Sequence, residues 1–110
     1  MMEQAKKYLS DILQAIELID QFTESIDDFE VYTSDLKTRS AVERQLGILG
    51  EAVNKYDKHF PEAPIENAKK IVGFRNRLIH AYDSVDSTIV WTIIKRHLSP
   101  LKEEIIRKLG

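Results

Sequence analysis

The stretch AVERQLGILGEAVNKY, residues 41–56, carries the clearest helical pattern in the chain. Its apolar residues recur at alternating steps of four and three positions: Val42, Leu46, Leu49, Val53 and Tyr56. This spacing places them on one face of an α-helix and is typical of the seam between helices in a bundle. We therefore expect a long helix over residues 34–58. Its start stays open, because Ser40 and Glu43 have the form of a capping box that would begin the helix later.

Two glycines, Gly47 and Gly50, lie one turn apart within this expected helix. Each costs about 1 kcal/mol relative to alanine in a helix interior. We expect that the close approach of a neighbouring helix requires them.

Toward the N-terminus, a second amphipathic pattern predicts a helix over residues 3–22. Its apolar positions again recur at steps of three and four: Ala5, Leu9, Ile12, Ile16 and Ile19. The pattern is lost over residues 23–33, where acidic residues gather. We expect a loop there with one additional helical turn, anchored by Phe29 or Val31.

Toward the C-terminus, Pro64 suits the first turn of a third helix, whose apolar stripe starts at Ile65 and continues to Ile79. A polar loop over residues 81–86 then leads to a fourth helix over residues 87–98, capped by Asp86 or Ser87. The inward positions of that helix are Ile89, Val90, Ile93 and Ile94, and it also contains Trp91.

A short last helix is expected over residues 100–109, because Ser99 and Pro100 have the form of an N-cap followed by proline at the first helical position. The predicted fold is all-α: an antiparallel four-helix bundle with a short C-terminal helix, formed by residues 1–110 as one domain.

The composition limits the kinds of protein that this chain can be. Hydrophobic residues make up 43% and charged residues 31%, as in a folded globular protein. The sequence has no cysteine, which excludes disulfides and thiolate metal sites. The first residues lack the apolar core of a signal peptide, and no apolar run is long enough to span a membrane, so we expect a cytoplasmic protein without a membrane partner. The net charge of −2 provides no global field for nucleic acid.

Any binding of nucleic acid must therefore come from local charge, and the candidates are Arg39, Arg44, Arg75 and Arg77. His59 and His97 have no companions at metal-ligand spacing, so we expect no metal site and no cofactor.

The stretch GFRNRLIHAYDSVD, residues 73–86, concentrates the chemistry-bearing side chains. Histidine can move a proton near neutral pH, and arginine can hold a phosphate and stabilise the charge that develops during its reaction. These residue types suit cleavage of RNA without a metal. Arg75 and His80 are five positions apart, about 140° around a regular helix, whereas Asn76 and His80 share a face. The arginine could join them through its long side chain, through a distorted helix or from a second subunit.

The same residues also have a purely structural interpretation. Arg75 and Arg77 would be solvated helix residues, His80 would be favoured at a helix C-terminus by the dipole, and Tyr82 would anchor the core. Glu51 could pair with either arginine, and this pairing needs no function.

The string RNRLIHAY, residues 75–82, followed by Val85 and Asp86, resembles the signature of the HEPN superfamily, and more narrowly that of the HepT-like toxins. Residues 39–44, 49–52, 60–61 and 88–98 also resemble strings of that family. One departure is Ile65, where relatives often carry a tryptophan, and this affects packing rather than chemistry.

The resemblance implies a homodimer whose Arg and His motifs face a shared cleft, acting as a metal-independent ribonuclease that arrests growth. It also implies a partner, a minimal nucleotidyltransferase antitoxin, that transfers AMP from ATP to a tyrosine. The resemblance gives the following residues their roles: Arg75 and His80 catalytic, Asn76, Arg77 and Glu51 supporting, and Tyr82 the modified tyrosine. The alternative is a catalytically silent module that uses the same cleft to dock a nucleotidyltransferase or a nucleotide.

Overall fold

The computed structural model describes residues 3–66, 68–80 and 86–110, except for the side chains of Ala68, Lys69, Arg75, Leu78, Ile79 and His80. Within these residues the secondary structure is helical and contains no strand. The all-α prediction is therefore confirmed for the described part of the chain.

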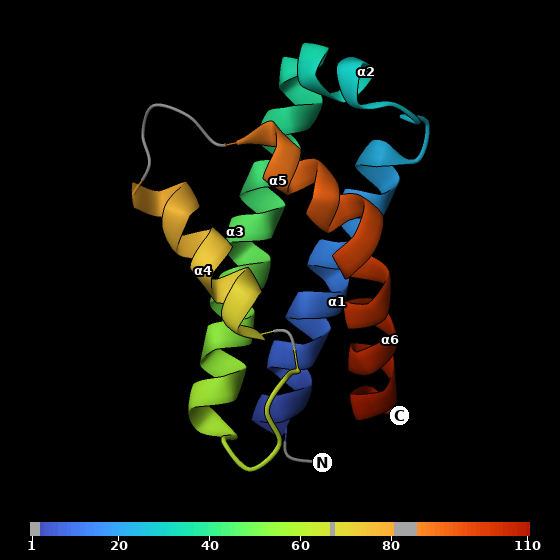
Figure 1. Ribbon diagram of the computed structural model, residues 1–110. Helices are drawn as coiled ribbons and strands as arrows, with labels where there is room; N and C mark the ends of the chain where they lie inside the picture. The colour runs from blue at the N-terminus through green and yellow to red at the C-terminus, as the bar shows by residue number, and fades with distance from the viewer. Residues whose placement is uncertain (1–2, 67, 81–85) are drawn as a thin grey trace.

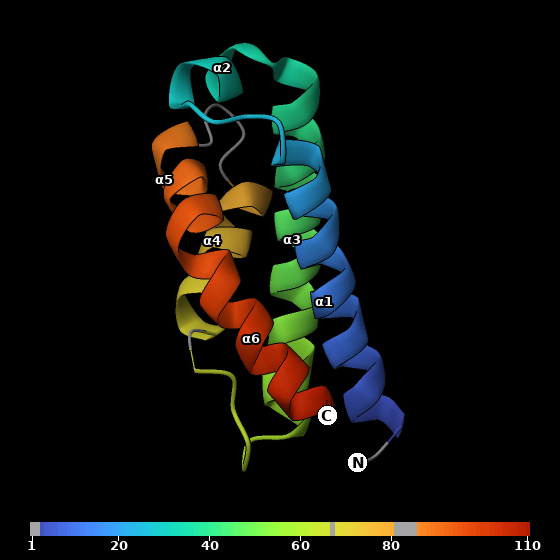
Figure 2. The same ribbon diagram turned by 90° about the vertical axis from the view of Figure 1, so that its right-hand side faces the viewer.

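The two longest helices form the centre of the molecule. α1 (Glu3–Thr23) and α3 (Leu36–His59) run in opposite directions and pack along their length. α4 (Ala68–His80) packs against α3, and α6 (Leu98–Leu109) packs against α1. In Figure 1, α4 lies on the left beside α3, and α6 lies on the right beside α1. The short helix α2 (Phe29–Ser34) lies across one end of the molecule (Figure 2).

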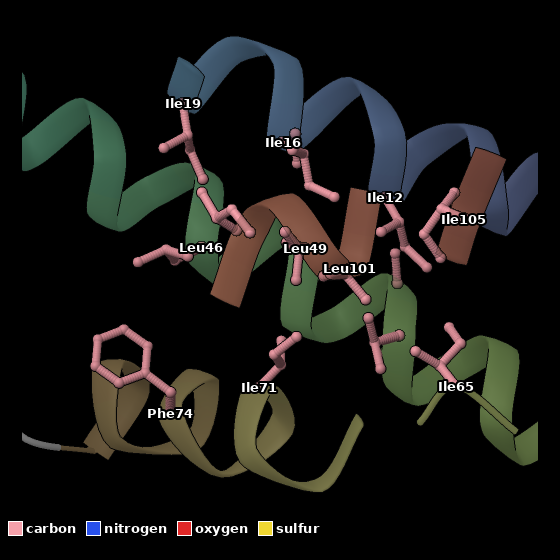
Figure 3. Packing of buried hydrophobic residues seen from close by; sticks show 14 of the residues in the cluster. Ile12, Ile16, Ile19, Leu46, Leu49, Ile65, Ile71, Phe74, Leu101 and Ile105 are labelled. Atoms are coloured by element: carbon pink, nitrogen blue, oxygen red, sulfur yellow. The ribbon is translucent and has the colours of Figure 1, made fainter. Parts of the chain in front are cut away.

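Apolar stripes from these helices meet in one core, as predicted from their spacing (Figure 3). Its fully buried members include Leu9, Ile12, Ile16, Ile19, Val42, Leu49, Val53, Leu101 and Ile105. Burying one such side chain stabilises the folded state by about 1.5–3 kcal/mol. The core therefore fixes how α3 and α4 lie, and α4 carries the Arg and His motif.

The expected extra turn is α2 (Phe29–Ser34), capped by Asp28, whose carboxylate accepts the Val31 N–H at 3.0 Å. Of the two predicted anchors, Phe29 is 36% exposed and packs edge-on against Trp91 with 6.2 Å between ring centroids, whereas Val31 was wrong, because it is 52% exposed. Tyr32 is fully buried instead and packs against Trp91, with 5.4 Å between ring centroids. Phe29 and Tyr32 are three positions apart on the same side of α2, so both rings reach Trp91.

Asp35 is the N-cap of α3, five residues before the alternative N-cap at Ser40. Its carboxylate accepts the Thr38 N–H at 3.1 Å and the Thr38 hydroxyl at 2.7 Å, and these hydrogen bonds lower the pKa of Asp35. The role expected for Gly47 is also wrong. A Cβ built at this position meets no atom within 4 Å, so no neighbouring helix approaches it closely among the described residues.

The third helix begins at Ala68 rather than at Pro64. Side chains from other helices hold the preceding loop: Asp57 accepts the Ile65 N–H at 3.0 Å, and Glu104 of α6 accepts the Glu66 N–H at 2.9 Å. Ile65 is buried as predicted, but from this loop. These hydrogen bonds satisfy backbone groups that would otherwise favour an earlier helix start.

Asp86 caps the fourth helix as expected, because its carboxylate accepts the Thr88 N–H at 2.9 Å. The predicted interruption at Ser99 and Pro100 was wrong. α5 (Ser87–Thr92), a π-helical turn η1 (Ile93–His97) and α6 follow one another without a break.

The π turn lies immediately before Pro100, and Leu98 donates to the carbonyl of Ile93, five residues earlier. Proline has no N–H to bond the carbonyl of Arg96 and its ring crowds that carbonyl, so a regular α-helix cannot continue through this point. The wider turn carries the helical run past the proline.

Candidate functional site

The motif predicted from sequence lies in the second half of α4. Arg75, Asn76, Arg77 and His80 all belong to this helix, and His80 is its last residue. The side chains of Asn76 and Arg77 are exposed. The side chains of Arg75 and His80 lie outside the described residues, and so does Tyr82 with the whole segment 81–85. Their roles therefore stay predictions.

The α-helical backbone still places these positions relative to one another. Asn76 and His80 are one turn apart along α4, as expected for residues that share a face. Arg75 and His80 are about 140° apart around the helix axis. The possibility of a distorted helix at this point loses support, because α4 is assigned as α-helix from Ala68 through His80.

A groove opens between α4 on one side and α5 with η1 on the other, with a volume of about 450 Å³. Its apolar walls are formed by Ile71, Phe74, Ile89 and Ile93. The polar residues that line it are Lys70, Arg77, Thr88, Thr92 and His97. Gly73 completes the α4 side. The groove is therefore apolar inside and polar at its rim, the usual composition of a small-molecule site.

The charge of this groove differs from that of the chain as a whole. Among the described residues that line it, the ionisable ones are Lys70, Arg77 and His97, and none of these described residues is acidic. The net charge of the chain is −2. A local positive surface in an acidic protein marks a place where an anion is favoured.

The other predicted candidates lie away from this groove. Glu51 is exposed on α3, and its carboxylate lies 3.4 Å from the Lys55 ammonium, one turn along the same helix. Arg44 is exposed on the same helix. Arg39 is half-buried and donates to the Thr33 carbonyl at 3.1 Å, so it holds the C-terminal end of α2. Arg39 therefore has a structural contact, and its role as a phosphate ligand stays a prediction.

Two perturbed groups accompany Arg39 at this end of the molecule. Burial, followed by the charge of Glu43, raises the pKa of Tyr32 to about 12. Burial likewise raises the pKa of Glu43, and the charge of Arg39 opposes that change. The Tyr32 hydroxyl has no hydrogen-bond partner in the described part of the chain. These groups are explained by burial, and none of them lines the groove.

Sequence reasoning missed Lys70, Gly73 and His97 as possible functional residues. Lys70 was not singled out, Gly73 only opened the stretch 73–86, and His97 was considered only as a metal ligand. The structure places all three around one groove. No local sequence signal could have found them, because η1 lies more than a dozen residues after the end of the α4 stripe and only the fold brings them together.

The described residues contain neither a candidate metal site nor a helix able to span a membrane. Residues 3–66, 68–80 and 86–110 contain no cluster of three or more His, Asp or Glu side chains able to hold a metal ion. In the same ranges, no helix combines the length and the apolar character needed to cross a membrane.

Comparison with known proteins decides the family. The family model described as ribonuclease HepT-like matches residues 12–107, a range that includes the whole of α3, α4 and α5. The chain belongs to the ribonuclease HepT-like family. This confirms the resemblance drawn from the RNRLIHAY string and supports a ribonuclease as the class of enzyme.

Individual relatives of this HepT-like chain agree with that assignment. It is 42% identical over 101 residues to the "Probable ribonuclease HepT" of Thermococcus cleftensis, covering 88% of each chain. It is 36% identical over 104 residues to the "Putative RNase MJ1380" of Methanocaldococcus jannaschii, covering 91% of this chain and 92% of that one. No solved structure matches significantly.

Proposed function

We propose that this HepT-like protein is a metal-independent endoribonuclease and the toxin of a toxin–antitoxin pair. Arg75 and His80 would be its catalytic residues, in a cleft formed by two copies of the chain. One observation carries the proposal: the family match includes the RNRLIH segment, and this segment lies on a single helix, α4. The antiparallel four-helix bundle expected of a HEPN protein is part of the same proposal.

The proposed reaction needs few groups of the chain besides these two side chains. His80 would take a proton from the attacking ribose hydroxyl or give one to the leaving oxygen as the phosphodiester bond breaks. Arg75 would hold the phosphate and stabilise the charge that gathers on its oxygens. Asn76, one turn before His80, would orient the imidazole or bind the phosphate. Arg77 would strengthen the local positive field.

The angular separation of Arg75 and His80 supports a dimeric site. Two positions about 140° apart on a straight helix do not face the same phosphate directly. A second copy facing the first would bring the arginine of one chain toward the histidine of the other. Glu51 is proposed to support the site through pairing with the arginines when the copies meet.

The proposed antitoxin is a minimal nucleotidyltransferase that adenylylates Tyr82. The tyrosine hydroxyl would attack the α-phosphorus of ATP, pyrophosphate would leave, and AMP would remain bonded to the phenolic oxygen. The adduct would add bulk and negative charge two residues after His80. It would therefore repel the RNA backbone and close the site.

Cleavage of RNA by purified protein in EDTA tests the catalytic proposal. We expect the wild type to cleave and both Arg75→Ala and His80→Ala to lose activity. His59→Ala is the matched control, because His59 is exposed at the end of α3 and its Nδ1 lies 2.9 Å from the Lys55 carbonyl oxygen. All variants must match the wild type in circular dichroism, and mass spectrometry must show Tyr82 unmodified.

Equal cleavage by the wild type and His80→Ala would contradict the assignment of the catalytic histidine. Absence of cleavage by unmodified wild type across several RNA classes would favour the alternative, a binding module that docks its nucleotidyltransferase. The adenylylation proposal has its own test. After incubation with the partner and ATP, the wild type should gain the mass of one AMP and Tyr82→Phe should not.

A further inference from the structure

We propose that the groove between α4 and α5–η1 binds one unpaired nucleotide of the RNA strand, next to the phosphate that is cut. This inference rests on the proposed ribonuclease function and specifies its substrate as single-stranded at this position. The base occupies the apolar interior of the groove, and the adjoining phosphates lie at its basic rim.

The size and walls of the groove suit a base. Its volume of about 450 Å³ lies within the range of roughly 300–1,000 Å³ found for small-molecule sites. Ile71 and Phe74 on α4 face Ile89 and Ile93 across it. A nucleobase buries its apolar faces against such walls, while Thr88 offers a hydroxyl at the opening and Thr92, whose hydroxyl donates to the Thr88 carbonyl at 2.8 Å, can still accept a hydrogen bond.

The charges at the rim favour RNA over a second copy of this chain. Lys70 and Arg77 are two turns apart on α4, and His97 lies opposite on η1. No acidic side chain among the described residues that line the groove opposes them. Lysine is depleted at the centre of protein–protein interfaces, whereas lysine and arginine beside a backbone are the standard means of holding nucleic acid.

The position of the groove connects it with the proposed catalytic residues. Arg77 lines it and precedes His80 by three residues on the same helix, so these two positions lie on one face of α4. A strand whose reacting phosphate lies near His80 therefore continues along α4 toward Arg77 and Lys70. A base in a duplex is stacked and paired and cannot enter a groove, so the arrangement selects unpaired nucleotides.

Gly73 provides a clean way to fill the groove. It lines the groove on α4, and a Cβ built there meets no atom within 4 Å. Gly73→Leu therefore places a side chain in or beside open space and replaces a poor helix former with a good one. Gly47→Leu is the matched control, since Gly47 also meets no atom within 4 Å but lies on α3, outside the groove lining.

The experiment measures the Kd of a fluorescein-labelled RNA decamer of mixed sequence, made uncleavable by 2′-fluoro substitution, at fixed salt. We expect Gly73→Leu to raise the Kd about fivefold or more, since loss of contacts to one base costs at least about 1 kcal/mol. Gly47→Leu should match the wild type. The same decamer annealed to its complement should bind more weakly than the single strand and should not distinguish the two variants.

A second pair of variants keeps the test valid if Gly73→Leu does not fold. Thr92 is exposed at the rim, so Thr92→Glu should raise the Kd of the decamer and Thr92→Lys should lower it. Unchanged Kd values in Gly73→Leu and in both Thr92 variants would overturn the proposal. A Gly73→Leu protein that binds the decamer normally but loses its dimeric mass in sedimentation would also overturn it, because the groove would then belong to the contact between copies.

This binding test is independent of catalysis. The probe cannot be cut, so its Kd does not depend on whether His80 acts. If His80→Ala cleaves like the wild type while Gly73→Leu still weakens the decamer, the catalytic assignment fails and the nucleotide site stands. If His80→Ala is inactive and the Kd values do not change, the nucleotide site fails and the catalytic assignment stands.

Discussion

Removing the Glu104 carboxylate tests how the loop before α4 is held. Glu104 is 9% exposed on α6, and its Oε2 accepts the Glu66 N–H at 2.9 Å, two residues before α4 begins. A hydrogen bond to a charged group contributes about 1.5–3 kcal/mol. Glu66 itself is exposed, so water can replace part of the bond in a variant. We therefore expect Glu104→Ala to lower the free energy of unfolding by about 1.5–2 kcal/mol, within the lower half of that range.

Urea titration followed by circular dichroism would measure this loss. It corresponds to a fall in Tm of roughly 6–8 °C for a domain of this size. Glu103→Ala is the matched control, because Glu103 is exposed and its replacement removes the same charge from the same helix. Glu104→Gln should lie between the two, since a neutral acceptor makes a weaker bond. If Glu104→Ala is as stable as Glu103→Ala, the carboxylate does not hold the loop and the reasoning is refuted.

Three further variants test other parts of the structure. Burial raises the pKa of Tyr32 to about 12 and leaves its hydroxyl without a partner in the described part of the chain, so Tyr32→Phe should be at least as stable as the wild type. A raised pKa gives stability that is present below the unfolded pKa of about 10 and is lost as pH rises through the folded value. Urea midpoints should therefore fall more for the wild type than for Tyr32→Phe between those two values, and parallel curves would contradict this. Gly47→Ala should raise the free energy of unfolding by about 1 kcal/mol, because the added methyl group meets no atom within 4 Å; a lower Tm would mean that a partner approaches this glycine. Arg77→Ala should reduce the slope of log K against log salt for the single-stranded decamer by about 0.7, and an unchanged slope would remove Arg77 from the phosphate contacts.

The parts of the fold that follow from helical periodicity were predictable. α1 and α3 match their predicted ranges to within two residues. Each carries a long apolar stripe on one face, and this stripe can be buried in only one orientation of the helix. Features that depend on tertiary contacts were not predictable. The start of α4 at Ala68 depends on Asp57 and Glu104, which lie on other helices and satisfy the loop.

The candidate site was likewise only partly predictable from the sequence. The RNRLIHAY string was enough to identify the family, because motif and neighbouring strings lie in the sequence itself. The groove was not predictable, because it forms only where the Lys70–Arg77 side of α4 meets α5 and η1. The roles of Arg75, His80 and Tyr82 remain predictions that the experiments above decide.

The π turn has a consequence for how the length of this chain can vary. Val90 and Leu98 are both buried although they are eight residues apart, a separation that in a regular α-helix turns them about 80° away from each other. The wider turn takes up one extra residue, so eight residues complete two turns and both side chains reach the core. Deleting one residue between 93 and 97 would therefore remove the wider turn and keep Val90, Leu101 and Ile105 in register, although Pro100 would then strain the helical run. A deletion elsewhere in the run would rotate the rest of it by about 100°. This turn is thus a position where insertions and deletions can accumulate during evolution, and each such change would reshape the groove while leaving the core intact.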